Sequence, residues 1–146
     1  MRFGILTAFA LCVTVAAPAF AQGSLLDPNS ATQQQLAAVP GLAPLAAQIV
    51  AKRPYASPAA FDAVLAAGNL TPQQRTQVYL RAWVPMNLNT ATPQDIMLIP
   101  GMSTRMMNEF REYKPYKSIG QFRYEIGKYV PKTEVARLEQ YVLVPK

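Results

Sequence analysis

Apolar residues recur along the chain at three- and four-residue spacing in short stretches, and proline, glycine or serine separates one stretch from the next. This period is that of a helix with one buried face. No stretch alternates between apolar and polar residues in the way a half-buried strand does. The pattern therefore predicts an all-α fold made of short helices.

The pattern of the first half of the chain returns in the second half. The stretch from Asn29 to Leu42 reappears sixty residues later, from Asn89 to Met102, with Asn, Ala, Thr, Pro and Gly at matching places. Four residues further on also match with a slip of one position, namely Pro54, Tyr55, Ser57 and Phe61 with Pro115, Tyr116, Ser118 and Phe122. An internal repeat determines the architecture. We expect two units of about four short helices each, residues 29–85 and 86–146, after a leader at residues 22–28.

The signals that start and stop helices agree with this division. Thr32 with Gln35, and Thr92 with Asp95, have the spacing of capping boxes. The expected helices of the first unit start at Thr32, Leu42, Ser57 and Thr71 and end near Val39, Arg53, Leu65 and Trp83. Their counterparts in the second unit start near Thr92, Thr104, Ser118 and Pro131. Residues 84–88 are too few for a free linker, so we expect the units to pack compactly on each other.

The first 21 residues have the features of a cleavable signal peptide. Arg2 precedes an apolar run from Phe3 to Ala17, and Ala19-Phe20-Ala21 is an A-x-A cleavage site. The run is shorter than the roughly 20 residues of a membrane span, which makes an uncleaved anchor the weaker alternative. We expect a periplasmic or secreted protein that begins at Gln22.

Cleavage would leave a chain without cysteine or histidine, because Cys12 lies in the leader and histidine is absent. This excludes Cys-His and His-dependent catalysis, disulfides and zinc sites of the usual kind. The spacing of the carboxylates does not suggest a catalytic pair, and the chain has no glycine-rich phosphate loop. We therefore expect a non-enzymatic protein with no cofactor, no metal and no small-molecule substrate. Without Arg2, 13 basic residues face 8 acidic ones, a balance that permits anionic partners without requiring them.

Each unit carries the pattern helix, h-Pro-Gly-h, helix, at Val39-Pro40-Gly41-Leu42 and at Ile99-Pro100-Gly101-Met102. With the preceding Asn89–Thr92, this resembles the helix-hairpin-helix domains of the ComEA family, exported proteins that capture DNA during natural transformation. The resemblance covers both units and is stronger in the second. The first unit, through Pro54–Ser57 and Asn69–Thr71, is also similar to the PsbU extrinsic protein of photosystem II, which uses this fold to bind other proteins.

The resemblance implies a site at the hairpins, but the residues there depart from the pattern of DNA-binding members. Those members have a second glycine that lets the backbone approach a phosphate. Ala43 and Ser103 occupy that place, and Ala46 and Met106 stand where a basic residue is common, although Arg105 is adjacent. The fold therefore transfers better than the DNA site.

Two candidate surfaces follow. The hairpin candidates are Gly41, Leu42, Gly101, Met102, Ser103, Thr104 and Arg105. Ser103 and Thr104 can either hydrogen-bond a phosphate or cap the second helix. The second candidate is a basic and aromatic face made of Arg111, Lys114, Tyr116, Lys117 and Arg123. Its alternative is a solvated face whose tyrosines are half buried between helices.

Four methionines, Met97, Met102, Met106 and Met107, surround the second hairpin. Converging thioethers bind copper, whereas separate ones make core or adaptable apolar contacts, and the spacing favours the contacts. Our preferred function is a protein-protein interaction module or accessory subunit in the periplasm, with a membrane complex as one setting. The alternative is a ComEA-like receptor for double-stranded DNA.

Overall fold

The computed structural model describes residues 24–145, so the expected signal peptide and the first two leader residues lie outside the described part. This part is mostly helical, which confirms the all-α prediction. Its eight α-helices are α1 (Gln33–Ala37), α2 (Ala46–Ala51), α3 (Pro58–Ala67), α4 (Pro72–Tyr79), α5 (Pro93–Met97), α6 (Thr104–Glu112), α7 (Ile119–Ile126) and α8 (Lys132–Glu139). None of these helices has the length and apolar character needed to span a membrane.

Three details differ from the sequence prediction. The helix expected over Leu42–Arg53 is divided into a 3-10 turn, Ala43–Leu45, and the short helix α2. Helix α4 ends at Tyr79 instead of Trp83, because the chain there turns to pair with the leader, with Leu26 donating to the carbonyl of Arg81 at 2.9 Å. Two short strands, β1 (Met86–Asn87) and β2 (Val142–Leu143), form a parallel pair that is too short to show alternation in the sequence.

The predicted helix caps are confirmed. Thr32 and Thr92 each form a capping box with the residue three positions later, Gln35 and Asp95. Thr71 also forms a capping box, and Ser57 and Ser118 accept a hydrogen bond from the third amide of their helices. Each cap satisfies amides that the first helical turn leaves without an internal partner.

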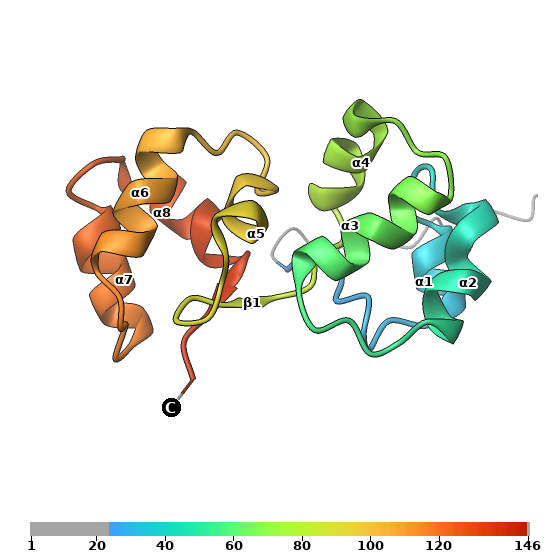
Figure 1. Cartoon of the computed structure of the whole chain (residues 1–146), viewed down its shortest axis with the longest axis horizontal. Coiled ribbons are helices and arrows are strands. Elements are labelled where there is room, and N and C mark those ends of the chain that lie inside the picture. The colour runs from blue at the N-terminus through green and yellow to red at the C-terminus, as the bar shows by residue number, and fades with distance from the viewer. Residues whose placement is uncertain (1–23, 146) are drawn as a thin grey trace, which may run out of the picture.

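Helices α1–α4 form one half of the molecule and α5–α8 the other, with β1 crossing between them (Figure 1). The two matching stretches make the same long-range contact. The Asn29 side chain exchanges two hydrogen bonds with the backbone of Tyr55, at 3.0 and 2.7 Å, and Asn89 does so with Tyr116, at 2.9 and 2.7 Å. Each asparagine thereby fixes the start of its half to the chain that leads into the third helix.

Aromatic side chains join the two halves. Trp83 is 1% exposed and packs edge-on against Tyr79 and Tyr141, with ring centroids 5.4 and 5.1 Å away. The indole N–H donates to the carbonyl of Tyr141 at 2.9 Å, and the Tyr141 hydroxyl donates to the carbonyl of Tyr79 at 3.2 Å. Buried residues from both halves belong to one continuous core, in agreement with the expected compact packing.

A buried carboxylate also links the halves. Asp95 is 4% exposed, and its Oδ2 accepts hydrogen bonds from the amide and hydroxyl of Thr92 at the start of α5. Its Oδ1 accepts from the amide of Ala59 at 3.0 Å, in the first turn of α3. Burial raises the pKa of Asp95, but the hydrogen bonds from Thr92, Ala59 and Ser57 outweigh it and hold the pKa below its usual value.

We expect Asp95→Ala to lower the free energy of unfolding by about 2 to 3 kcal/mol, because the change removes a cap and leaves the Ala59 amide without its acceptor. Urea titration followed by the fluorescence of Trp83, the single tryptophan, measures this. Gln35→Ala is the matched control in the first half, where the side chain caps only its own helix, and should cost about 0.5 kcal/mol.

The pH dependence of stability in wild type and in Asp95→Ala tests whether the charge of Asp95 matters. Because the pKa of Asp95 is lower in the folded state than in the unfolded state, the ionised carboxylate stabilises the fold at neutral pH. This stabilisation is lost as the pH falls through the folded-state pKa. The difference in the free energy of unfolding between wild type and Asp95→Ala should therefore become smaller as the pH is lowered. A difference that stays constant with pH would contradict the assigned role of the charge.

Candidate functional site

Each hairpin turns at a glycine with left-handed backbone geometry. Gly41 has φ of 87° and Gly101 has φ of 78°, and the residue after each donates to the carbonyl of Val39 or Ile99 at 3.0 Å. Positions 43 and 103 have no such geometry, since Ala43 starts a 3-10 turn and Ser103 is extended with φ of −101°. These backbones therefore do not require the second glycine that the DNA-binding pattern has.

The first hairpin is exposed at Pro40, Gly41, Ala43 and Pro44 but carries no charged residue. Leu42 is completely buried in the core, so the structure corrects its assignment as a contact residue. An apolar side chain at this place fills the space between the two helices of the hairpin. Gly41 is exposed, but residues 37–47 around it carry no charge.

The second hairpin is exposed at Gly101, Ser103, Thr104 and Arg105, whereas Met102 is half-buried. Ser103 caps α6, because its hydroxyl accepts a hydrogen bond from the amide of Met106 at 3.2 Å. The structure thus shows the capping alternative for Ser103, and Thr104 is the first residue of the helix. Arg137 of α8 donates to the carbonyl of Pro100 at 3.0 Å and fixes the hairpin to the rest of its half.

A groove of about 210 Å³ lies between the second hairpin and α4. The second half contributes its residues 97–102 to the lining, including Met97, which is 42% exposed, and Met102. The first half contributes the opposite wall, made of Asp62, Pro72, Arg75, Thr76 and Tyr79. The groove therefore exists only where the two halves meet.

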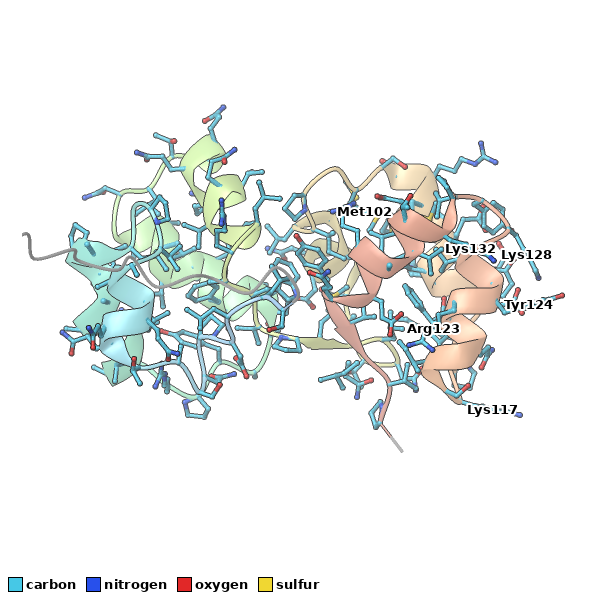
Figure 2. The ribbon with its side chains drawn as sticks, turned by 180° about the vertical axis from the view of Figure 1, so that it is seen from behind. Met102, Lys117, Arg123, Tyr124, Lys128 and Lys132 are labelled. Atoms are coloured by element: carbon cyan, nitrogen blue, oxygen red, sulfur yellow. The ribbon has the colours of Figure 1, made fainter. Side chains whose placement is uncertain are left out.

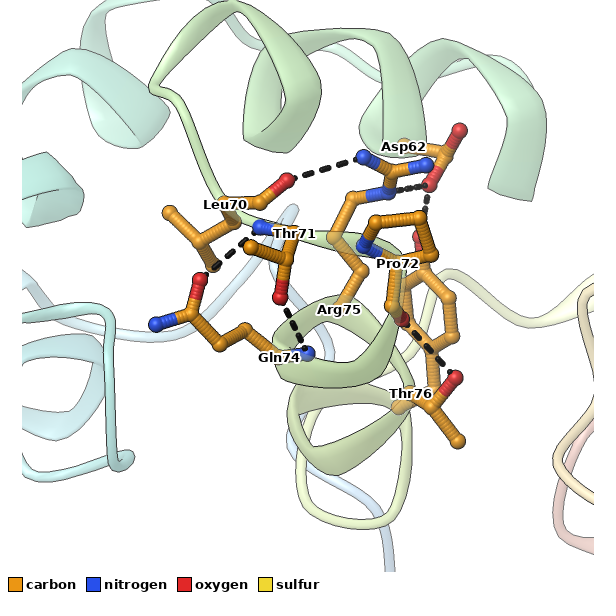
Figure 3. A network of polar contacts seen from close by, with 8 residues as sticks. Asp62, Leu70, Thr71, Pro72, Gln74, Arg75 and Thr76 are labelled. Carbon is orange, nitrogen blue, oxygen red and sulfur yellow. Dashed lines mark hydrogen bonds and ion pairs between the residues drawn. The ribbon is translucent and has the colours of Figure 1, made fainter.

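Polar contacts hold the wall on the side of the first half (Figure 3). Arg75 Nε is 2.7 Å from Asp62 Oδ1, and Arg75 Nη1 donates to the carbonyl of Leu70 at 2.9 Å. The Tyr79 hydroxyl donates to the same carboxylate. Burial, together with the hydrogen bond to Asp62, raises the pKa of Tyr79 well above its usual value, so this hydroxyl keeps its proton. Asp62 and Arg75 therefore neutralise each other within the wall, and uncharged residues, among them Thr76, Met97 and Met102, make up the rest of the lining.

The predicted basic and aromatic face is only partly a surface. Tyr116 is 2% exposed and packs against Phe122, so its assignment to the surface is wrong; the contact with Asn89 draws the tyrosine inward. Lys114 donates to the carbonyl of Ala91 at 2.6 Å, and burial, with Arg111 nearby, lowers its pKa. Lys114 is therefore half-buried and has an internal partner.

The remaining members of that face are exposed. Arg111 and Lys117 are exposed, and Arg123 forms two hydrogen bonds with the carboxylate of Glu139, one of them at 2.7 Å. Lys117, Tyr124 and Lys128 lie toward the side of the second half that is remote from the first, whereas Met102 lies nearer to the first half (Figure 2). The two predicted surfaces are therefore separate.

Sequence reasoning missed the groove wall on the side of the first half. The packing of α4 against the second hairpin brings Arg75 and Thr76 to the groove. No local pattern in the sequence predicts this long-range contact. Met106 and Met107 are half-buried against the core, while Met97 and Met102 line the groove, in keeping with the apolar-contact interpretation. Within residues 24–145, no group of three or more acidic, histidine or cysteine side chains is arranged to hold a metal.

Comparison of the chain with protein-family models, with curated proteins and with solved structures found no match.

We expect Gly101→Ala to reduce the free energy of unfolding by about 1 to 2 kcal/mol, because a side chain disfavours the left-handed backbone. A Cβ at this position would come no closer than 3.8 Å to Arg137 Nη2, so the cost is conformational and not steric. Gly101→Asn should cost less, since asparagine tolerates this region. Gly120→Ala in α7 is the contrasting control: the backbone there is helical, a Cβ would have room, and stability should not fall.

Proposed function

We propose that this chain is an exported, non-enzymatic binding protein of two tandem helix-hairpin-helix units, and that it binds a protein partner through the groove between them. Three observations support the tandem interpretation. The two halves have the same order of helices, the same glycine turn and the same asparagine contact. The signal-peptide pattern of residues 1–21 supports export to the periplasm.

The groove is the observation that carries the proposal. It is concave, it is lined by residues of both units, and two methionines on one side give it an adaptable apolar surface. The ion pair of Asp62 and Arg75 stiffens the opposite wall, which is useful because a preorganised site loses less entropy on binding. A protein-interaction module or accessory subunit, including one that serves a membrane complex, fits this arrangement.

DNA binding has less support. The first hairpin carries no charge. In the second hairpin, the Ser103 hydroxyl caps α6 by accepting a hydrogen bond from the amide of Met106, and residues 97–102 line the groove. The feature that favours DNA is Arg105, which is exposed beside the second hairpin.

Photo-crosslinking tests the groove. A photoreactive phenylalanine analogue in place of Met97 should give a discrete crosslinked product in cells of the source organism. Thr76→Trp should abolish the product, because an indole on the opposite wall fills the groove. The analogue at Gln34, exposed on α1, is the control and should give no product. A product that survives Thr76→Trp would place the contact elsewhere.

Titration of the chain from Gln22 with a short labelled DNA duplex, at low and at physiological salt, tests the alternative. We expect no binding that depends on Arg105. Binding that weakens steeply with salt and disappears in Arg105→Glu, but persists in Met102→Asp, would instead identify a DNA-binding protein.

A further inference from the structure

Helices α3 and α7 occupy the same place in the two halves but differ on their outer faces. Ser57 and Ser118 cap them, and Phe61 and Phe122, each four residues after the cap, are completely buried. We define the α7 face as Lys117, Gly120, Tyr124 and Lys128, together with Lys132 at the start of α8. The residues 61 positions before the first four are Ala56, Ala59, Ala63 and Ala67.

The folding of α7 does not require a large side chain at position 124, because α3 forms with Ala63 at the corresponding place. The start of α3, where the amide of Ala59 donates to Asp95, lies against the other half. Tyr124 is 69% exposed, and the figure from behind shows it pointing away from the body of the molecule (Figure 2). A large exposed ring is characteristic of contact surfaces, where its apolar body is covered and its hydroxyl stays wet.

The charge of the α7 face is positive. Two of the nearby acids are paired, Glu125 with Lys128 and Glu139 with Arg123, so the net positive charge of the face comes from Lys117 and Lys132. Lys117 and Lys132 have no carboxylate partner among residues 24–145 and lie toward opposite ends of the face in Figure 2. The Lys128 ammonium lies over the Tyr124 ring, 4.8 Å from its centroid, which keeps cation and ring together.

The α7 face is also open. Gly120 is exposed, and a Cβ there would meet only the Ser118 hydroxyl at 3.6 Å, so the helix backbone can come close to a flat partner. The groove described above lies elsewhere, between the two halves. An exposed tyrosine between two lysines that are unpaired within the described chain fits an extended anionic surface, which can contact both lysines at once.

We propose that the α7 face binds the anionic headgroups of a lipid membrane surface. Lysines on flexible stems suit a mobile array of phosphates, and tyrosine is favoured at the membrane interface. A nucleic acid is the poorer match, because Arg123 is paired with Glu139 and Lys128 with Glu125, which leaves two separate lysines and no arginine fork for bidentate phosphate binding. This binding is independent of the groove and would hold the protein at a membrane with the groove free.

Vesicle sedimentation tests the proposal. The chain from Gln22 is suitable, because the described residues bury a continuous core among themselves. It should bind vesicles that contain phosphatidylglycerol and release them at high salt, and it should not bind vesicles of phosphatidylcholine alone. Lys117→Ala and Lys132→Ala should each weaken partition by about fivefold. Tyr124→Ala should weaken it as well.

Two controls make the result specific. Lys52→Ala removes an exposed lysine from the first half and should leave partition unchanged. The fluorescence of Trp83 should be the same in all variants, since alanine is the residue that α3 carries at the positions of Lys117 and Tyr124. The proposal is wrong if phosphatidylglycerol vesicles are not bound at low salt, or if the three α7-face variants bind as wild type does. It is also wrong if a DNA duplex binds more tightly than the vesicles through the same residues.

Discussion

The carboxylate of Asp95 lies at the start of two helices that belong to different halves of the molecule, and the packing of the halves depends on it. One of its oxygens accepts hydrogen bonds from Thr92 in its own half, and the other accepts from the amide of Ala59 in the other half. A buried charge is stable only where donors surround it, and here the positive ends of two helices supply them. The first half has Gln35 at the same place, which caps its own helix alone. The corresponding residues, Gln35 and Asp95, both cap their own helix, but only Asp95 also contacts the other half.

The groove follows from this junction. Asp95 holds the start of α3 against α5, and the chain from Met97 to Met102 that follows α5 then lies opposite α4. Trp83 and Tyr141 close the other side of the junction with a hydrogen bond and an edge-on ring contact. Neither half alone has both walls of the groove. The proposed binding function is therefore a property of the pair of units, although each hairpin pattern is complete within one unit.

Much of the fold could be predicted from local signals. The caps at Thr32, Ser57, Thr92 and Ser118 are determined by neighbouring residues, and the helices that follow these caps begin where the sequence indicates. The ends of helices were harder to predict, because long-range hydrogen bonds can end a helix. Just after the end of α4, the amide of Leu26 donates a hydrogen bond to the carbonyl of Arg81. The site was harder still. Tyr116 and Lys114 look like surface residues in the sequence, yet long-range contacts with Asn89 and Ala91 draw them inward. A repeat predicts that such contacts recur, but not which face of each copy remains exposed.

The repeat is most informative where its copies disagree. Where they agree, as at Asn29 and Asn89, the shared residue meets a need of the fold, since both copies use it for the same contact. Where the two copies have different residues on an exposed face, the copy with the smaller side chains shows which residues are enough for folding. The larger side chains of the other copy are then not explained by folding. Helix α3 forms with Ala63 at the place where α7 has Tyr124, and the lysines of the α7 face lie just before and just after α7 and at the start of α8. The exposed ring of Tyr124 is therefore not needed for this helix to form, since the corresponding helix of the other half forms without it.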